Sequence, residues 1–175
     1  SEQFADPVYS PQDINHPFNP KSPYSVSKIA SQHLTRIYRE AFGLKVIQCI
    51  CFNYESPLRQ TYFVSRKITL GVARILKAIQ DNQSFKPIYL GNVDSKRDWS
   101  HCVDFVDGMF KAINQENLKE YVFASGETHS VREFVQKSFD FAGIPGVWHG
   151  EGINARSEEH TSELQSRQYL VCRLL

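Results

Sequence analysis

An excess of charge of either sign is missing from this sequence, and long apolar runs are missing too. The 175 residues carry 20 Lys and Arg against 19 Asp and Glu, which gives a formal net charge of +1. This balance gives no reason to expect a nucleic acid or a membrane surface as a partner. No apolar stretch reaches the roughly 20 residues of a membrane-spanning helix, and no signal-peptide pattern opens the chain.

Cysteine is also scarce, and the few that are present have neither the spacing of metal ligands nor that of a disulfide framework. They are Cys49, Cys51, Cys102 and Cys172. Cys49 and Cys51 alternate within an apolar run, which predicts buried free thiols in a reducing compartment and therefore a cytoplasmic protein. The histidines are scattered, and no two have metal-ligand spacing, so the sequence predicts no metal site.

What the chain does contain is an alternation of helical and strand-like segments. Hydrophobic residues make up 41% of it, enough for one domain with a core. Ser22, Pro23 and Gly43 suit the N-cap, the first position and the C-terminal stop of a helix. Helices are predicted over residues 22–43, 63–79, 101–114 and 130–143, and strands over 44–52, 87–91 and 120–125. This alternation predicts an α/β fold.

The two ends of the chain depart from that alternation. Nothing in residues 1–6 predicts a helix or a strand, and the five prolines of Pro7–Pro23 are typical of a surface loop. Residues 156–166 are polar and without period, and they resemble the translated sequence of a common sequencing-library adapter. We therefore expect residues 156–175 to be an assembly artefact. The alternative is a charged linker that leads to a partner-binding helix.

The segment "SPYSVSKIA" places Tyr24 and Lys28 four residues apart, on one face of the first predicted helix. A free phenol has a pKa of about 10, too high for a general base at neutral pH. A neighbouring ammonium group favours the phenolate. The two residues are therefore a candidate acid–base pair, although the same spacing recurs on many surface helices.

Four segments stand out in order along the chain: "SPYSVSKIA", "CFNYESPLRQTYFVSRKI", "LGNVDSKRDWSHCVDFVDGM" and "FASGETHSVREFVQKSF". Together they resemble the GDP-mannose 4,6-dehydratase family of the extended short-chain dehydrogenase/reductases. The resemblance runs from Ser1 to about residue 150. It implies that residues 1–62 are the C-terminal part of an NAD(P)-binding Rossmann-like domain. Residues 63–155 would then be mainly a smaller sugar-nucleotide-binding α/β region, with Rossmann segments interleaved.

The resemblance also implies a reaction. GDP-mannose loses water to give GDP-4-keto-6-deoxy-mannose, and NADP is regenerated in each turnover. Tyr24 matches the tyrosine that takes the proton from the sugar O4. Lys28 matches the lysine that binds the nicotinamide ribose and favours the phenolate. Glu2 matches the carboxylate that removes the C5 proton as the C6 hydroxyl departs, and a carboxylate in a dry site can serve as a base and then as an acid.

Further positions match residues that the family uses for binding. Tyr54 and Arg59 match cofactor contacts, and Tyr54 stands where the family usually has His. Five others match substrate contacts: Asn53 near the diphosphate-sugar, Val64 and Lys67 near the guanine and its nucleotide, Arg97 on the diphosphate and Arg132 near the nucleotide. Spacing alone would equally allow a turn asparagine at residue 53 and solvated surface arginines in the last two cases.

The same resemblance implies that the chain is truncated at its N-terminus. The threonine expected just before Ser1 is absent, and so is any glycine-rich fingerprint for the cofactor phosphates. We therefore expect no turnover from these 175 residues alone, and a homo-oligomer for the complete protein. The departures at Tyr54 and Leu58 leave open a non-catalytic GDP-sugar-binding module, and Gln60 and Ser100 also depart from the family pattern. A related nucleotide-sugar epimerase or dehydratase is a further alternative.

Overall fold

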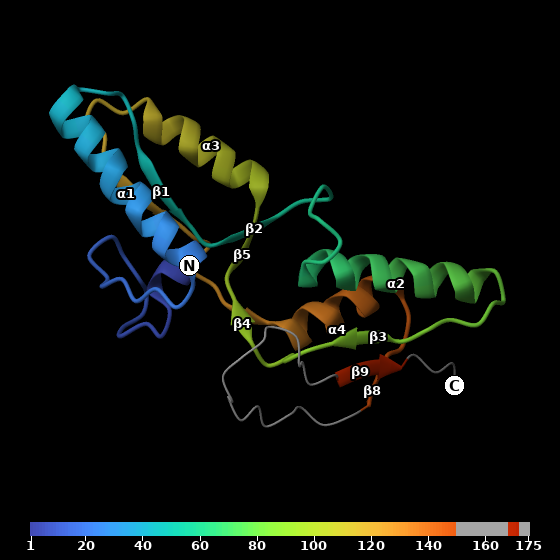
Figure 1. Ribbon diagram of the computed structural model, residues 1–175. Coiled ribbons are helices and arrows are strands. Elements are labelled where there is room, and N and C mark those ends of the chain that lie inside the picture. Colours follow the sequence, from blue (N-terminus) through green and yellow to red (C-terminus); the bar gives the residue numbers. More distant parts are fainter. Residues whose placement is uncertain (150–167, 172–175) are drawn as a thin grey trace. The chain divides into compact units, whose positions relative to one another are not determined.

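The computed structural model describes residues 1–149 and 168–171, which fold into two compact units (Figure 1). The first unit combines Ser1–Ser56 with Asp98–Glu127. The second combines Pro57–Arg97 with the chain from Thr128 onward. Each unit is therefore built from segments that are separated in the sequence. No helix among the described residues is long and apolar enough to cross a membrane.

The first unit contains parallel strand pairs and two long helices. Its elements are the 3-10 helix η1 (Glu2–Phe4), α1 (Pro23–Phe42), β1 (Gln48–Cys51), β2 (Asn53–Glu55), β5 (Trp99–His101), α3 (Cys102–Ile113) and β6 (Glu120–Phe123). Strand β1 pairs in parallel with β6, and β2 pairs in parallel with β5. Within this unit α1 contacts β1, and α3 contacts β6. Parallel strands joined through helices confirm the predicted α/β class.

Helix α1 begins and ends where the sequence predicts. The Ser22 side chain accepts a hydrogen bond from the Ser25 backbone N–H, and the Ser25 hydroxyl accepts one from the Ser22 backbone N–H. Pro23 occupies the first helical turn, where its missing N–H costs nothing. Gly43 ends the helix with φ of 64° and donates to the Tyr38 carbonyl oxygen, a left-handed stop that favours glycine.

The apolar side of α1 is largely uncovered among the described residues. Helix α1 buries only Ser25 and Gln32. The spacing of its apolar residues predicts a helix that packs along a core, but several of these side chains are at least half exposed. They are Val26 at 54%, Leu34 at 54%, Ile37 at 50% and Phe42 at 67%. The periodicity therefore identifies the helix correctly, whereas it does not identify what the helix buries.

The second unit packs two helices against short antiparallel strands. Its elements are α2 (Val64–Gln80), β3 (Ile88–Leu90), β4 (Lys96–Arg97), β7 (His129–Ser130), α4 (Val131–Ala142), β8 (Val147–His149) and β9 (Gln168–Val171). Strand β9 lies between β3 and β8, and β4 pairs with β7. Helices α2 and α4 contact each other, with Ile68, Ile75, Val135 and Phe139 buried.

Several elements differ from the sequence-based expectation. The strand predicted over 44–52 is only Gln48–Cys51, and the expectation of no helix in residues 1–6 is wrong, because Glu2–Phe4 forms η1. Strands β2, β4, β5 and β7 are two or three residues long and too short to give a periodic pattern. Residues 156–167 and 172–175 of the expected artefactual tail lie outside the described residues, whereas Gln168–Val171 forms β9.

Candidate functional site

The predicted catalytic residues of the first unit lie at or beside the N-terminal end of α1. Tyr24 and Lys28 lie in the first two turns, and the Lys28 Nζ is 5.3 Å from the centre of the Tyr24 ring. The Ser22 hydroxyl, at the N-cap, donates to the Glu2 carboxylate at 3.5 Å. The three residues that the sequence proposes for catalysis are thus brought to one helix end, where the helix dipole favours negative charge.

The surroundings of these residues are open rather than dry. Tyr24 is 59% exposed, and Glu2 and Lys28 are exposed as well. The dry environment expected around the Glu2 carboxylate is therefore not formed by the described residues. A phenol and an ammonium group that both face solvent can contact a ligand from the solvent side.

The Cys51 thiol, at the end of β1, is influenced by the charge of Lys28 in α1. The pKa of Cys51 is raised to about 11, chiefly by burial and also by the neighbouring Cys49, while the positive charge of Lys28 opposes the rise. Lys28 therefore lies near the carboxyl end of β1. In open α/β sheets, ligands bind outside the carboxyl ends of the parallel strands, so α1 presents its polar side at the expected edge. Cys49 and Cys51 are free thiols, as predicted, but half-buried rather than fully buried.

Asn53 and Tyr54 extend the same edge through β2. Asn53 is half-buried and lies in register with Trp99 of β5. The Tyr54 ring packs on Phe105 of α3 with 5.1 Å between ring centres, and Tyr54 stays 41% exposed. The residue that replaces the usual histidine is thus held by an aromatic contact, with part of its surface free for a ligand.

In the second unit, three predicted binding residues lie at the start of α2. The Arg59 guanidinium stacks on the Phe63 ring at 3.6 Å, and Val64 is the first residue of the helix. The N-cap, Phe63, has no side-chain capping bond, and the first turn holds no acidic residue. Since Lys67 follows directly, positive charge gathers at the positive end of the helix dipole, an arrangement that favours an anionic ligand.

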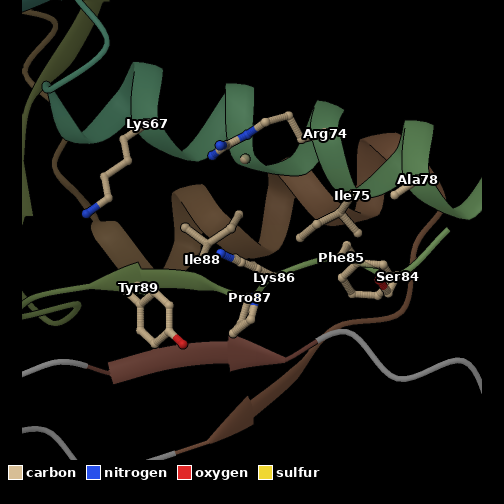
Figure 2. Close-up of a pocket in the computed structure, with 11 residues that line it drawn as sticks. Lys67, Arg74, Ile75, Ala78, Ser84, Phe85, Lys86, Pro87, Ile88 and Tyr89 are labelled. Carbon is tan, nitrogen blue, oxygen red and sulfur yellow. The ribbon is translucent and has the colours of Figure 1, made fainter.

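Lys67 also lines a groove between α2 and the segment that leads into β3 (Figure 2). The groove has a volume of about 500 Å³ and an apolar floor that includes Ile75 and Ile88. Arg74 and Lys86 add two more cations, and none of the described residues that line the groove is acidic. Sequence reasoning missed both of them. The available signal was α2 itself, whose 17 residues contain Arg and Lys but no Asp or Glu.

The two predicted arginines near β4 have different surroundings. Arg97 is exposed in β4, and its side chain donates to the Lys96 carbonyl oxygen at 2.7 Å. Arg132, at the start of α4, pairs with Asp94 at 3.1 Å and lies over the Trp148 ring at 4.8 Å. Arg97 is therefore available to a ligand, whereas Arg132 already has an acidic and an aromatic partner.

The predicted site residues fall into two groups, one in each unit. Glu2, Tyr24, Lys28, Asn53 and Tyr54 belong to the first unit, and Arg59, Val64, Lys67, Arg97 and Arg132 belong to the second. The residues predicted for acid–base chemistry thus lie in one unit, and the predicted binding arginines lie in the other. Sequence reasoning also missed Asp98, which is only 5% exposed and accepts three hydrogen bonds. Its place in "KRDW" gave no signal of burial.

Comparison with known proteins gives a consistent result. The family model described as GDP-mannose 4,6 dehydratase matches residues 1–171. GDP-mannose 4,6 dehydratases from Drosophila melanogaster and Dictyostelium discoideum are each 41% identical, over 154 and 170 residues. These alignments cover 88% and 97% of this chain but only 38% and 46% of the two relatives, so the chain spans less than half their length.

A solved structure supports the fold. RMD from Pseudomonas aeruginosa, complexed with NADPH, matches with a TM-score of 0.73 at 22% identity, over 83% of this chain and 49% of that one. A likeness at this identity establishes the partial Rossmann-like α/β fold. With the family model matching nearly the whole chain, this protein belongs to the GDP-mannose 4,6-dehydratase family.

Proposed function

We propose that the complete protein is an NADP-dependent GDP-mannose 4,6-dehydratase, which removes water from GDP-mannose to give GDP-4-keto-6-deoxy-mannose. The observation that carries this proposal is the placement of Tyr24 and Lys28 in the first turns of α1, with Glu2 bonded to the N-cap of the same helix, in a chain that belongs to this family. The activity is proposed for the whole protein, because the chain spans less than half the length of its relatives.

The residues of the first unit would share the proton transfers. Tyr24 accepts the proton of the sugar O4 as the C4 carbon is oxidised, and the Lys28 ammonium favours the phenolate that this step needs. Oxidation at C4 acidifies the C5 hydrogen. Glu2 removes it and passes a proton to the departing C6 hydroxyl, so one carboxylate acts first as base and then as acid.

The exposed side chains of α1 fit the nicotinamide half of an NADP molecule. The Tyr24 hydroxyl and the Lys28 ammonium lie on one open helix face, and ribose hydroxyls can bond with both groups. Bound NADP would take up hydride from the sugar and return it within one turnover. Tyr54 and Arg59 would hold the rest of the cofactor. The glycine-rich segment expected for its phosphates is absent from these 175 residues, so we expect no turnover from this chain alone.

The second unit would bind the nucleotide-sugar through its cations. Arg97 would bind the diphosphate bidentately. Asn53, which belongs to the first unit, is proposed separately as a substrate contact. Val64 and Lys67 lie at the uncapped start of α2, which suits the guanine nucleotide, and the acid-free groove beside Lys67 adds positive potential. Arg132 would reach the nucleotide only by leaving Asp94.

Further properties of the whole protein follow from the family and belong to this proposal. We propose a homo-oligomer that works in the cytoplasm. We also propose that residues 1–62 belong to the catalytic Rossmann-like domain and residues 63–155 mainly to the sugar-nucleotide-binding region.

The acid–base role of Tyr24 is tested by Tyr24→Phe in the full-length enzyme. We expect formation of the 4-keto product to fall by at least about a hundredfold, the usual contribution of a positioned general base, while GDP binding stays near the wild-type value. Tyr38→Phe, at an exposed tyrosine of the same helix, should retain full activity. Turnover that survives Tyr24→Phe unchanged would exclude this mechanism.

A non-catalytic GDP-sugar-binding module is the second candidate. It is favoured by the open surroundings of Glu2 and by the replacement of a family histidine at Tyr54. It predicts tight GDP-mannose binding with no 4-keto product in a full-length wild-type protein that is supplied with NADP. Detection of the 4-keto product in that assay would exclude the binding module and support the dehydratase.

A further inference from the structure

Asp98 is a buried carboxylate that none of the roles above uses. Its Oδ1 accepts from the Ser125 backbone N–H at 3.0 Å and from the Ser125 hydroxyl at 2.9 Å, and its Oδ2 accepts from the Gly126 N–H at 2.9 Å. Among residues 1–149 and 168–171 it forms no ion pair, so the buried carboxylate is stabilised by these hydrogen bonds from Ser125 and Gly126. Hydrogen bonds to an ionised group are stronger than neutral ones, and leaving such a group unpaired when buried is costly.

Asp98 stands between two residues whose backbones are fixed by different strand pairs. On one side, Arg97 of β4 is in register with His129 of β7. On the other side, Trp99 of β5 is in register with Asn53 of β2. Three consecutive residues therefore connect the strand that carries the proposed diphosphate-binding arginine to the strand partner of the proposed substrate-binding asparagine.

The partners of Asp98 lie on a second connection between the units. Ser125 and Gly126 follow β6, and the chain leaves the first unit after Glu127 to enter β7. Gly126 has a φ of 85°, which lets its N–H face the carboxylate in a loop that other residues adopt only with strain. Asp98, the residue after Arg97, is thus fastened within the first unit to the loop that follows β6.

We propose that Asp98 is a positioning residue for diphosphate recognition, because its carboxylate holds Ser125 and Gly126 and thereby fixes the backbone directly after Arg97. Among residues 1–149 and 168–171 the Arg97 side chain bonds to the carbonyl of its own neighbour and to no acidic group, so its placement depends on the backbone. This inference rests on the proposed function, in which Arg97 binds the diphosphate of GDP-mannose.

The test is a steady-state comparison of Asp98→Asn with wild type in the full-length enzyme. The asparagine side chain has nearly the same volume as aspartate and keeps one acceptor oxygen. Its NH₂ group would face the Gly126 N–H, so the hydrogen bond from Gly126 is lost. We expect KM for GDP-mannose to rise about tenfold, the loss of roughly one charge-assisted hydrogen bond, with kcat within about twofold of wild type. Asp104→Asn, at an exposed aspartate of α3, is the matched control and should leave both constants unchanged.

A second pair of variants tests the same inference even if the Asp98→Asn protein does not fold well. Ser125→Ala deletes the hydroxyl donor, and Ser125→Thr keeps it, so KM should rise in the first variant and return to the wild-type value in the second. A merely structural role would lower the melting temperature without this split between KM and kcat.

Arg97→Ala separates the two ways in which the inference can fail. If Arg97→Ala raises KM while Ser125→Ala and folded Asp98→Asn leave it unchanged, the positioning role is wrong and the diphosphate assignment stands. If Arg97→Ala leaves KM unchanged, the diphosphate assignment itself is wrong, and the inference that rests on it is overturned as well.

Discussion

At the scale of single residues, the reactivity of the Cys51 thiol reports on how near the Lys28 charge lies to the end of β1. Burial raises the pKa of Cys51 to about 11, so only about a thousandth of it is thiolate, the reactive form, at pH 8. We expect its alkylation by iodoacetamide, followed by mass spectrometry, to speed up about tenfold for each pH unit up to about 11.

Removal of the Lys28 charge should slow that alkylation, because Lys28 opposes the rise in the pKa of Cys51. Lys28→Met is the informative variant, and Lys21→Met, at an exposed lysine that pairs with Asp6 at 3.5 Å, is its control. Equal alkylation rates in both variants would mean that Lys28 does not face the end of β1.

The same thiol also makes the stability of the chain depend on pH. A group whose pKa is raised by folding contributes fully below its unfolded-state pKa, which is about 8.5 for a thiol, and loses that contribution as pH rises through the folded-state value. The free energy of unfolding should therefore decrease between about pH 8.5 and pH 11, as measured by urea denaturation. Cys51→Ala should show a smaller decrease over the same range. A decrease of equal size in both proteins would contradict the assignment.

At the scale of elements, Gly71 explains how α2 approaches β3 so closely. A Cβ built at Gly71 would lie 2.5 Å from Ile88 Cδ1 and 2.7 Å from Ile88 Cγ1. Alanine is intrinsically better than glycine in a helix by about 1 kcal/mol, but overpacking of a core costs about 1–3 kcal/mol. We therefore expect Gly71→Ala to lower the free energy of unfolding by about 1 kcal/mol in urea denaturation.

Ile88→Val provides the control for this packing argument, because it removes the Cδ1 atom nearest to the added methyl group. Alone it should cost about 1 kcal/mol, the usual effect of deleting one buried methyl group. Combined with Gly71→Ala it should cost less than the sum of the two single changes. Strict additivity would show that the two residues do not meet.

The elements also show which parts of the structure can be read from the sequence. The ends of α1 are predictable, since Ser22 and Gly43 act on backbone groups within one turn. Strands β4 and β7 are not, because the register of Arg97 with His129 depends on segments about thirty residues apart in the chain. The same holds for the groove beside Lys67, where Lys86 is brought to α2 by tertiary packing alone.

At the scale of the whole molecule, the candidate site is predictable only where its residues lie close in the sequence. The spacing of Tyr24 and Lys28 on one helix predicts their meeting, and the structure confirms it. The burial of Asp98 cannot be read from its neighbours, because it depends on a loop that returns after β6. Local patterns thus predict single helices and helix-borne pairs, whereas sites assembled from distant segments require the fold.

The uncovered side of α1 makes the 175-residue chain prone to self-association. Val26, Leu34, Ile37 and Phe42 are at least half exposed, and the formal net charge is only +1, so electrostatic repulsion between copies is weak near the sequence pI of about 7.7. In light scattering coupled to gel filtration at pH 7.5, we expect an apparent mass above 20.1 kDa that increases with concentration.

Two variants test whether self-association depends on the apolar row of α1, formed by Val26, Leu34, Ile37 and Phe42, or on exposed apolar residues in general. Leu34→Lys places a charge within the row and should shift the apparent mass toward 20.1 kDa. Phe141→Lys, at a residue of α4 that is 96% exposed, adds the same charge elsewhere and should have a smaller effect. Because both variants change the net charge equally, a greater effect at Leu34 can come only from the position of the charge. An equal effect would mean that association depends on net charge rather than on the apolar row of α1.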